Sequence, residues 1–522
     1  MSEATTSADT GVTGQSTAER ADMAALARGG RLNFLGFVIR LIARLPFLFV
    51  AGRVYGAEAL GRFAYAVLVV ELAAQLSTVG LKRGLAQMLA TSDKPAANIV
   101  ADAMLVSLIG SLVSMAILMS FPVAMFPNSP INGLDWALPV TVLAIAWTDI
   151  ALAALAYRHN IGATVRARSV VEPWTISIVA WVWIYISLRD GLIISYVASM
   201  VSAMVVALIP LLRSYGIPHG WQPDWALTWK TVRRYLPLAA ADAVEWGSRR
   251  VDIAVLGLFM SPTFVGVYYA AQQVASLPAK LKTSFEPVLG PAIARGVAAK
   301  DYESIARQVR QVSFWILGAQ AGIALALGIP GRAVMGLVGS QFTGGTATLA
   351  FLLAAEVAAA TAVVSEAALI YVARHRNMVI SIAMLAIEAA LCAGLIIAMQ
   401  DLHWPDAWVA TGPAVALTVS LAIASIVKSR LLHRKLGHAV TGWRWTLLWS
   451  AAAAIAVGVP ARLFLPEFYQ LILGIPLILG AFCLVLWFKG FGPEDRELFK
   501  MRKKDIEDIQ LPPPGSAPDA PV

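Results

Sequence analysis

AGRVYGAEALGRFAYA, residues 51–66, aligns with LGLFMSPTFVGVYYAA, residues 256–271, when the chain is shifted by 205 positions (256 − 51). The alignment needs no gap, and its identical pairs are Gly52 with Gly257, Gly61 with Gly266 and Ala66 with Ala271. Each stretch joins the first and second apolar segments of a set of six. We therefore predict two repeated halves. An even number of membrane-spanning helices in each half makes the repeats parallel, related by an axis along the membrane normal.

The composition indicates an integral membrane protein. Of 522 residues, 58% are hydrophobic and 14% are charged, whereas soluble domains carry about 25% charged residues. A membrane-spanning helix needs about 20 apolar residues, and roughly fourteen such segments occur. We expect an all-α polytopic membrane protein with about 14 transmembrane helices, in two six-helix lobes and two C-terminal helices. The segments are centred near residues 42, 73, 109, 146, 178, 201, 247, 275, 320, 358, 389, 419, 454 and 478.

The predicted boundaries follow these segments and the polar stretches between them. They are a disordered cytoplasmic tail at 1–28, a first lobe at 29–213, a cytoplasmic linker at 214–231, a second lobe at 232–432, two trailing helices at 433–489 and a cytoplasmic tail at 490–522.

Loop charge predicts the orientation in the membrane. YRHNIGATVRARS and VKSRLLHRKLGHAVTGWR, two of the alternate loops that we expect in the cytoplasm, are rich in Lys and Arg. The opposite loops, such as FPNSPINGLDW and SPTF, are nearly free of them. The positive-inside rule then places both termini in the cytoplasm of a multi-pass protein of the bacterial inner membrane. Topology also explains the net charge of +9 better than nucleic-acid binding does, since the basic residues form no single patch.

Two arginines interrupt the first apolar segment. Arg40 and Arg44 lie about 14 and 20 Å from the cytoplasmic end of their predicted helix, at about 1.5 Å per residue. An ionisable side chain costs about 2.5–3.5 kcal/mol at the membrane centre, so these side chains must face protein or water. The shift of 205 residues places Arg44 on Arg249 of the seventh segment.

The seventh segment, LPLAAADAVEWGSRRVDIAVLGLF, carries a stripe of mixed charge. We expect Asp242, Glu245, Arg249 and Asp252, spaced three, four and three residues apart, to share one face of one helix. Arg250 then points about 100° away. Glu71 and Asp149 add acidic groups on the second and fourth helices.

Two interpretations of these charges stay open. They are structural ion pairs, such as Arg44 with Glu71 or Arg249 with Glu245, or they line a hydrated cavity between the lobes. A cavity lined by arginines would suit phosphate, because the planar guanidinium donates bidentate hydrogen bonds and stays protonated. The repeat favours the cavity, since it places cations at equivalent positions in both halves.

No sequence motif for catalysis or metal binding was found. Neither the six histidines nor Cys392 and Cys483 have metal-ligand spacing, and no nucleophile elbow or phosphate loop occurs. We expect no enzyme activity, no metal and no cofactor.

Three parts of the chain resemble bacterial Wzx-type oligosaccharide flippases, of the superfamily that also holds MATE-type multidrug exporters and the lipid II flippase MurJ (the MOP superfamily). They are YGAEALGRFAYA with TVGLKRGLA, RRVDIAVLGLFMSPTFVGVYYAAQQVASLP with EPVLGPAIARG, and MGLVGSQFTGGTATLAFLLAAE. The resemblance spans roughly residues 28–490. It implies alternating access and transfer of undecaprenyl-diphosphate-linked oligosaccharide for lipopolysaccharide, capsule or exopolysaccharide. The implied headgroup-binding residues are Arg40, Arg44, Arg249 and Arg250.

The resemblance leaves other roles open. Glu71, Asp149, Asp242, Glu245 and Asp252 serve either in ion coupling or in ion pairs. Membrane lipids, the polysaccharide polymerase and the glycosyltransferases of one pathway are the expected partners. The alternatives are a cation-coupled multidrug exporter and a membrane polymerase or ligase. The short external loops argue against an enzyme that works outside the membrane, and the cationic cavity argues against a drug exporter.

Overall fold

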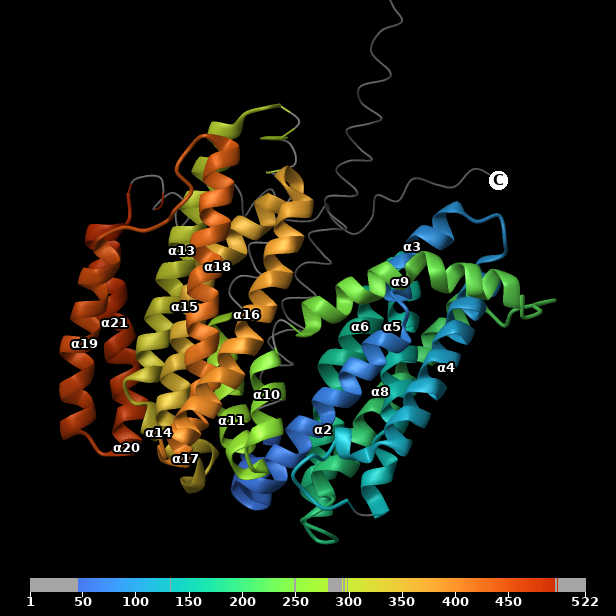
Figure 1. Cartoon of the computed structure of the whole chain (residues 1–522), viewed down its shortest axis with the longest axis horizontal. Coiled ribbons are helices and arrows are strands. Elements are labelled where there is room, and N and C mark those ends of the chain that lie inside the picture. The colour runs from blue at the N-terminus through green and yellow to red at the C-terminus, as the bar shows by residue number, and fades with distance from the viewer. Residues whose placement is uncertain are drawn as a thin grey trace, which may run out of the picture. The chain divides into compact units, whose positions relative to one another are not determined.

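The computed structural model describes residues 46–131, 133–247, 250–279, 293, 296–297, 299–492 and 495. In these ranges all regular secondary structure is helical, and no strand occurs among them (Figure 1). The predicted all-α class is therefore confirmed.

The earlier elements of the chain, including short π and 3₁₀ turns labelled η, follow one another with short connections. They are η1 (Ala51–Tyr55), α2 (Gly56–Ser77), α3 (Leu81–Thr91), α4 (Ala96–Ser120), η2 (Pro122–Ala124), η3 (Gly133–Ala137), α5 (Val140–Tyr157), α6 (Ile161–Thr164), η4 (Val165–Val171), α7 (Glu172–Trp183), α8 (Gly191–Tyr215), α9 (Trp225–Gly247), α10 (Val251–Phe259) and α11 (Pro262–Ala279).

The later elements contain the longest helices. They are α13 (Tyr302–Gly328), α14 (Gly331–Val338), η6 (Ser340–Gly345), α15 (Thr346–Val372), α16 (Arg374–Asp401), α17 (Asp406–Val409), α18 (Gly412–Leu436), α19 (Thr446–Phe464), α20 (Glu467–Tyr469), η7 (Gln470–Gly474), α21 (Ile475–Val485) and η8 (Leu486–Gly490).

Ten helical stretches of the described residues are long and apolar enough to cross a membrane. The number of transmembrane helices expected from the sequence, about fourteen, therefore remains a prediction. The segment predicted near residue 42 lies largely outside the described residues. The one near 178 is the 12-residue α7, preceded by the π-helical η4, and the one near 247 is interrupted between α9 and α10.

The chain divides into two compact units, which we describe separately. Unit 1 comprises the described residues of Met1–Val274, Val334–Phe351 and Ile382–Ser420, and unit 2 those of Ala275–Ala333, Leu352–Ser381 and Leu421–Val522. The predicted lobe boundaries stay predictions, since neither unit is one continuous segment.

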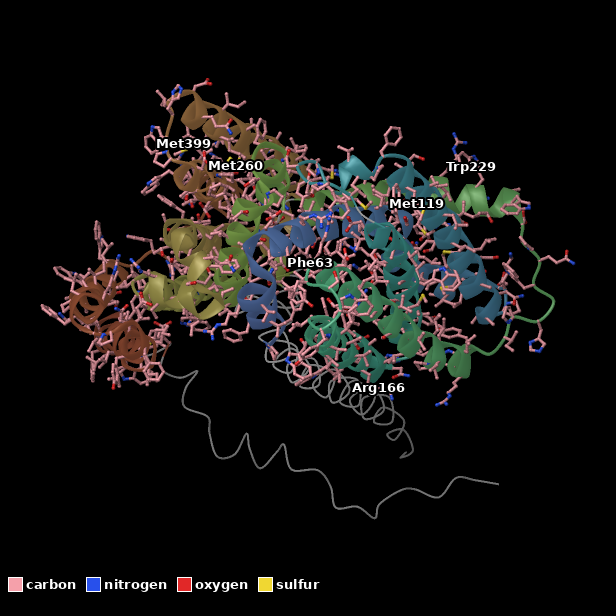
Figure 2. The ribbon with its side chains drawn as sticks, turned by 90° about the horizontal axis from the view of Figure 1, so that it is seen from below. Phe63, Met119, Arg166, Trp229, Met260 and Met399 are labelled. Carbon is pink, nitrogen blue, oxygen red and sulfur yellow. The ribbon has the colours of Figure 1, made fainter. Side chains whose placement is uncertain are left out.

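Unit 1 packs small and branched apolar residues between α3, α4, α5, α8 and α9. Leu81, Ile150 and Leu155 are fully buried there, and Tyr235 of α9 closes the cluster. Phe63 of α2 is also buried and meets the ring of Tyr196 edge-on, with 5.8 Å between centroids. Figure 2 shows Phe63 among the helices, whereas Trp229 of α9 points away from them.

Unit 2 is built around α13, α19 and α21. Phe314 and Phe482 lie in its core and are almost completely buried. Asp495 fixes the end of this unit by accepting hydrogen bonds from Arg444 (2.8 Å), the Trp315 indole (2.9 Å) and the Gly492 backbone (2.9 Å). Burial by itself would raise the pKa of the Asp495 carboxyl, but these donors outweigh burial and hold its pKa below the ordinary value.

The predicted repeat is visible where α2 crosses α11. A Cβ added at Gly61 would overlap the carbonyl oxygen of Pro262, and one added at Gly266 would overlap that of Ala57. A shift of 205 residues turns the first contact into the second (57 + 205 = 262; 61 + 205 = 266). The two halves therefore meet here through the same contact made twice, as a two-fold axis requires. Glycine allows the two backbones to approach this closely.

Candidate functional site

Three networks of charged side chains in unit 1 contain predicted site residues, and the first of them joins α2, α8 and α10. Arg250, at the start of α10, pairs with Glu71 of α2. Tyr196 of α8 donates its hydroxyl to the other carboxylate oxygen of Glu71 at 3.3 Å. The Arg250 guanidinium carbon also lies 4.9 Å from the ring centroid of Trp246, within cation–π range.

The Arg250 side chain keeps 38% of its surface exposed, and that of Glu71 keeps 26%. An arginine facing hydrocarbon is costly, so the exposed part of this pair needs water or a polar ligand beside it. Glu71 accepts one N–H of a guanidinium that carries five. The predicted residues Arg250 and Glu71 therefore meet in one partly open site.

The second network joins α3, α5 and η4. Asp149 of α5 pairs with Arg168 of η4 and lies 3.7 Å from the Lys82 ammonium of α3. Arg168 also donates to Glu172 at 2.9 Å, and both carboxylate side chains are only 11% exposed. Two cations thus balance two carboxylates, which makes this a closed structural cluster.

Sequence reasoning missed Arg168, because we expected its segment, YRHNIGATVRARS, to be a cytoplasmic loop, whereas its side chain is only 18% exposed. The segment is mostly helical, and η4 carries Arg168 against Asp149. The signal available in the sequence was the spacing of Arg168 and Glu172, one helical turn apart.

The third network corrects the predicted seventh helix. The stripe from Asp242 to Asp252 does not share one face of one helix, because α9 ends at Gly247 and α10 begins at Val251. Asp242 and Glu245 instead pair with Arg83 of α3, at 2.8 and 2.6 Å. These two carboxylates hold α9 against α3 rather than lining a site together with Asp252.

Asp252 belongs to a separate, buried acidic pair. It is 1% exposed and accepts hydrogen bonds from the Tyr268 hydroxyl (2.6 Å) and the Gln272 amide (3.2 Å). Glu388 of α16 is 4% exposed, its Oε1 has no hydrogen-bond partner, and it is close enough to interact electrostatically with Asp252.

No lysine or arginine of the described residues pairs with either member of this acidic pair. Two neighbouring carboxylates in a low-dielectric interior cannot both stay ionised without a counter-charge. Uptake of a proton or a small cation by Asp252 or Glu388 would relieve this repulsion. The proximity of Glu388 to Asp252 depends on the packing of residues more than 130 positions apart in the chain, which no local sequence pattern encodes.

The family model described as "Polysaccharide biosynthesis protein" matches residues 50–326, more than half of the chain.

The chain belongs to this family.

None of the curated proteins matches the chain. Among solved structures, the lipid II flippase MurJ in an inward closed conformation is similar, with a TM-score of 0.67 and 12% identity, over 90% of this chain and 100% of that one. An inward-facing multidrug resistance transporter of the MATE family gives a TM-score of 0.63 and 13% identity, over 76% and 94% of the two chains. A transporter of the MOP superfamily from Pyrococcus furiosus gives 0.53 and 15%, over 79% and 95%.

At these identities the likeness to solved structures shows the fold. It confirms the predicted all-helical, multi-pass fold. Together with the family match, it supports a membrane transport protein of polysaccharide biosynthesis rather than an enzyme.

Three of the predicted headgroup-binding arginines of this polysaccharide biosynthesis protein, Arg40, Arg44 and Arg249, lie outside the described residues. Their role stays a prediction. Of the predicted set, Arg250 is described. Within the described ranges no three His, Cys, Asp or Glu side chains are grouped for a metal ion.

Proposed function

We propose that the protein carries undecaprenyl-diphosphate-linked oligosaccharide repeat units from the inner to the outer leaflet, by alternating access, for export of a surface polysaccharide. The observation that carries this proposal is the partly exposed Arg250–Glu71 pair inside a polysaccharide biosynthesis family fold. The expected setting is the bacterial inner membrane with both termini in the cytoplasm. The polymerase and glycosyltransferases of the same pathway are the expected partners.

Arg250 binds the anionic headgroup in this proposal. A diphosphate offers oxygens to the guanidinium N–H groups that Glu71 does not use, in charge-assisted hydrogen bonds about twice as strong as neutral ones. Glu71 then competes with the headgroup for the same cation, so that the headgroup can leave again. We propose the same headgroup-binding role for Arg40, Arg44 and Arg249, as the sequence predicts.

The acidic pair Asp252–Glu388 supplies a coupling site. In this proposal the buried pair takes up a proton or a small cation, and each binding and release changes the charge inside unit 1 by at least one. A transport cycle coupled to a proton or cation gradient needs such a change. This role also fits a drug exporter, so the pair does not by itself identify the cargo.

Deleting the protein in its host and extracting the lipid-linked glycans tests the function. Flipping predicts that complete oligosaccharide accumulates on undecaprenyl diphosphate while surface polysaccharide is lost. Unchanged surface polysaccharide and unchanged lipid intermediates would overturn the proposal and favour multidrug export. Accumulation of unpolymerised repeat units in the outer leaflet would instead favour a polymerase.

Complementation of the deletion tests the site. Arg250→Gln should lower polysaccharide export by about tenfold or more, since one charged hydrogen bond contributes roughly 1.5–3 kcal/mol. Arg307→Gln is the matched control, because Arg307 is 58% exposed and pairs only weakly, at 3.9 Å, with Glu303. If both variants are present in the membrane at equal levels and export equal amounts of polysaccharide, Arg250 does not bind the headgroup.

A further inference from the structure

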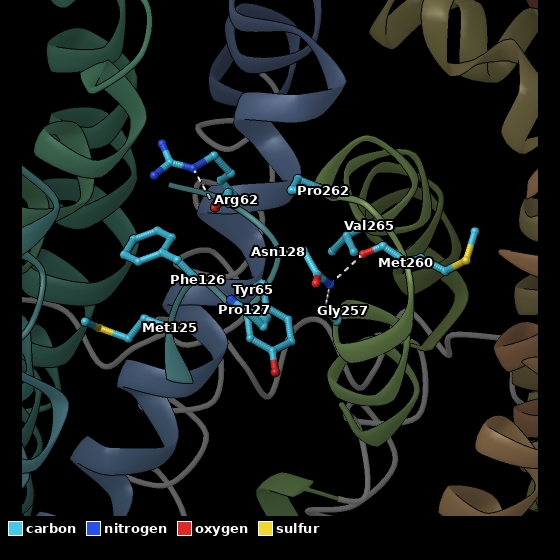
Figure 3. A pocket seen from close by; sticks show the side chains of 12 residues that line it. Arg62, Tyr65, Met125, Phe126, Pro127, Asn128, Gly257, Met260, Pro262 and Val265 are labelled. Carbon is cyan, nitrogen blue, oxygen red and sulfur yellow. Dashed lines mark hydrogen bonds between the residues drawn. The ribbon is translucent and has the colours of Figure 1, made fainter. Parts of the chain in front are cut away.

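The loop between α4 and α5 reaches across to the other half of the repeat. Asn128 in this loop donates its side-chain amide to the carbonyl oxygens of Gly257 (2.9 Å) and Met260 (3.1 Å), at the C-terminal end of α10 (Figure 3). Carbonyl groups in the last turn of a helix have no partner within the helix. Asn128 therefore caps the turn that joins α10 to α11.

The second half of the repeat makes an equivalent contact to the first half. Gln341 of η6 donates its amide to the carbonyl oxygen of Gly52 at 3.0 Å, and its side-chain oxygen accepts the Ala57 N–H at 3.3 Å. Gly52 is the residue that the shift of 205 aligns with Gly257. Each half thus places one side-chain amide on the equivalent glycine carbonyl of the other half.

Both contacts lie in the turns next to the crossing of α2 and α11. Figure 1 shows that α2 and α11 meet at the end of unit 1 opposite α3 and α9. The predicted orientation makes this the external end, because Asn128 lies in the predicted external loop FPNSPINGLDW and Met260 precedes SPTF. For cargo to leave outward, α2 must separate from α11 here. The two amide contacts and the glycine crossing all resist that separation.

The two amide contacts are strong enough to keep the external end of unit 1 closed and weak enough to let it open. They are neutral hydrogen bonds, each contributing a factor of about five to an equilibrium. When they break, water can replace them, because both glycine carbonyls lie at helix ends. A buried ion pair would be a poor substitute, since parting two buried charges costs far more.

We propose that Asn128 and Gln341 form a reciprocal latch that closes the external end of unit 1, and that outward opening requires both amides to leave their glycine carbonyls. The proposal rests on the proposed transport function for its purpose. The contacts themselves do not depend on that function. They affect the equilibrium between the closed and open states even when no cargo is bound.

The test measures opening directly. Val265 is 2% exposed beside the crossing, so a Val265→Cys variant, with Cys392 and Cys483 replaced by Ala, reports opening through its reaction with a membrane-impermeant maleimide. Asn128→Asp replaces the donor NH₂ with an oxygen that repels both carbonyls. It should raise the labelling rate about tenfold or more, since it removes two hydrogen bonds.

Gln341→Glu should raise the labelling rate by a smaller factor, because its carboxylate still accepts the Ala57 N–H. Gln87→Glu is the matched control: Gln87 is an exposed residue of α3, at the opposite end of unit 1. Gly266→Ala opens the crossing by a different route, through overlap with the Ala57 carbonyl, and should also raise labelling.

The latch would be overturned if Asn128→Asp and Gln341→Glu, each in the Val265→Cys background, were labelled at the rate of Gln87→Glu while Gly266→Ala was still faster. Failure of the transport function gives a different result. Labelling would then follow the latch variants as expected, while deletion of the protein leaves the host's lipid-linked glycans unchanged. Monodisperse size-exclusion profiles distinguish an opened protein from an unfolded one.

Discussion

Replacing Arg62 should destabilise the loop that carries Asn128. Arg62 of α2 is 7% exposed and donates to Asp135 (2.8 Å), Ser129 (3.0 Å) and the Pro130 carbonyl (2.9 Å). Removing one partner of a buried ion pair costs about 3–5 kcal/mol, because the remaining charge keeps its desolvation penalty. We expect Arg62→Met to lower the free energy of unfolding by about that amount.

Thermal unfolding of the purified protein in detergent measures this loss, which should lower Tm by several degrees, at about 2–4 °C per kcal/mol. Arg332→Met is the matched control. Arg332 pairs with Glu467 at 3.2 Å, but the two side chains are 71% and 56% exposed, so we expect a loss of only about 0–1 kcal/mol. The double variant Arg62→Met/Asp135→Leu should recover part of the stability. A Tm for Arg62→Met equal to that of the control would refute the reasoning.

Variants of Glu388, Arg168 and Asp495 test three other groups of charged residues. Glu388→Gln should abolish the dependence of transport on the proton or cation gradient while the protein still inserts into the membrane. Transport into proteoliposomes measures this dependence. If the variant depends on the gradient as the wild type does, Glu388 has no role in coupling. Arg168→Met should cost about 3–5 kcal/mol, since it leaves Asp149 and Glu172 facing each other; Arg168→Lys should lose less, and an unchanged Tm in both would contradict the cluster. Asp495→Asn should destabilise unit 2 above pH 4. The folded pKa of Asp495 is below the ordinary 3.8, so its stabilisation is complete above that value and is lost as pH falls through the folded pKa. The difference in Tm between wild type and Asp495→Asn should therefore disappear at acidic pH. A difference that does not change with pH would contradict the stabilising role of the ionised Asp495 carboxylate.

The apolar segments and the repeat were predictable because both depend on local pattern. A run of about 20 apolar residues has few alternatives in a membrane, where every backbone group must be satisfied internally. The alignment of Gly61 with Gly266 was also present in the sequence. Its physical meaning, two backbones in contact, became clear only when α2 and α11 were seen to cross.

The partners of the charges were not predictable, because spacing along one helix says nothing about neighbouring helices. Asp242 and Glu245 have the right spacing to share a face with Asp252, yet the helix stops at Gly247 and Arg83 takes both carboxylates. Similarly, Lys428 was expected in a cytoplasmic loop, but α18 continues through it and its ammonium meets Glu366 at 3.0 Å.

The turn at the start of α2 has a consequence for biosynthesis. Arg53 donates to the Leu337 carbonyl and Ala57 to Gln341, and in each contact the partners are 284 residues apart in the chain. At about 5–20 residues per second, the ribosome needs roughly 15–60 s to supply those partners. The first helices must therefore enter the membrane and wait there with this turn open. Water at the membrane surface can satisfy its polar groups during that interval, which is possible because the turn lies at the end of a helix and not in its middle.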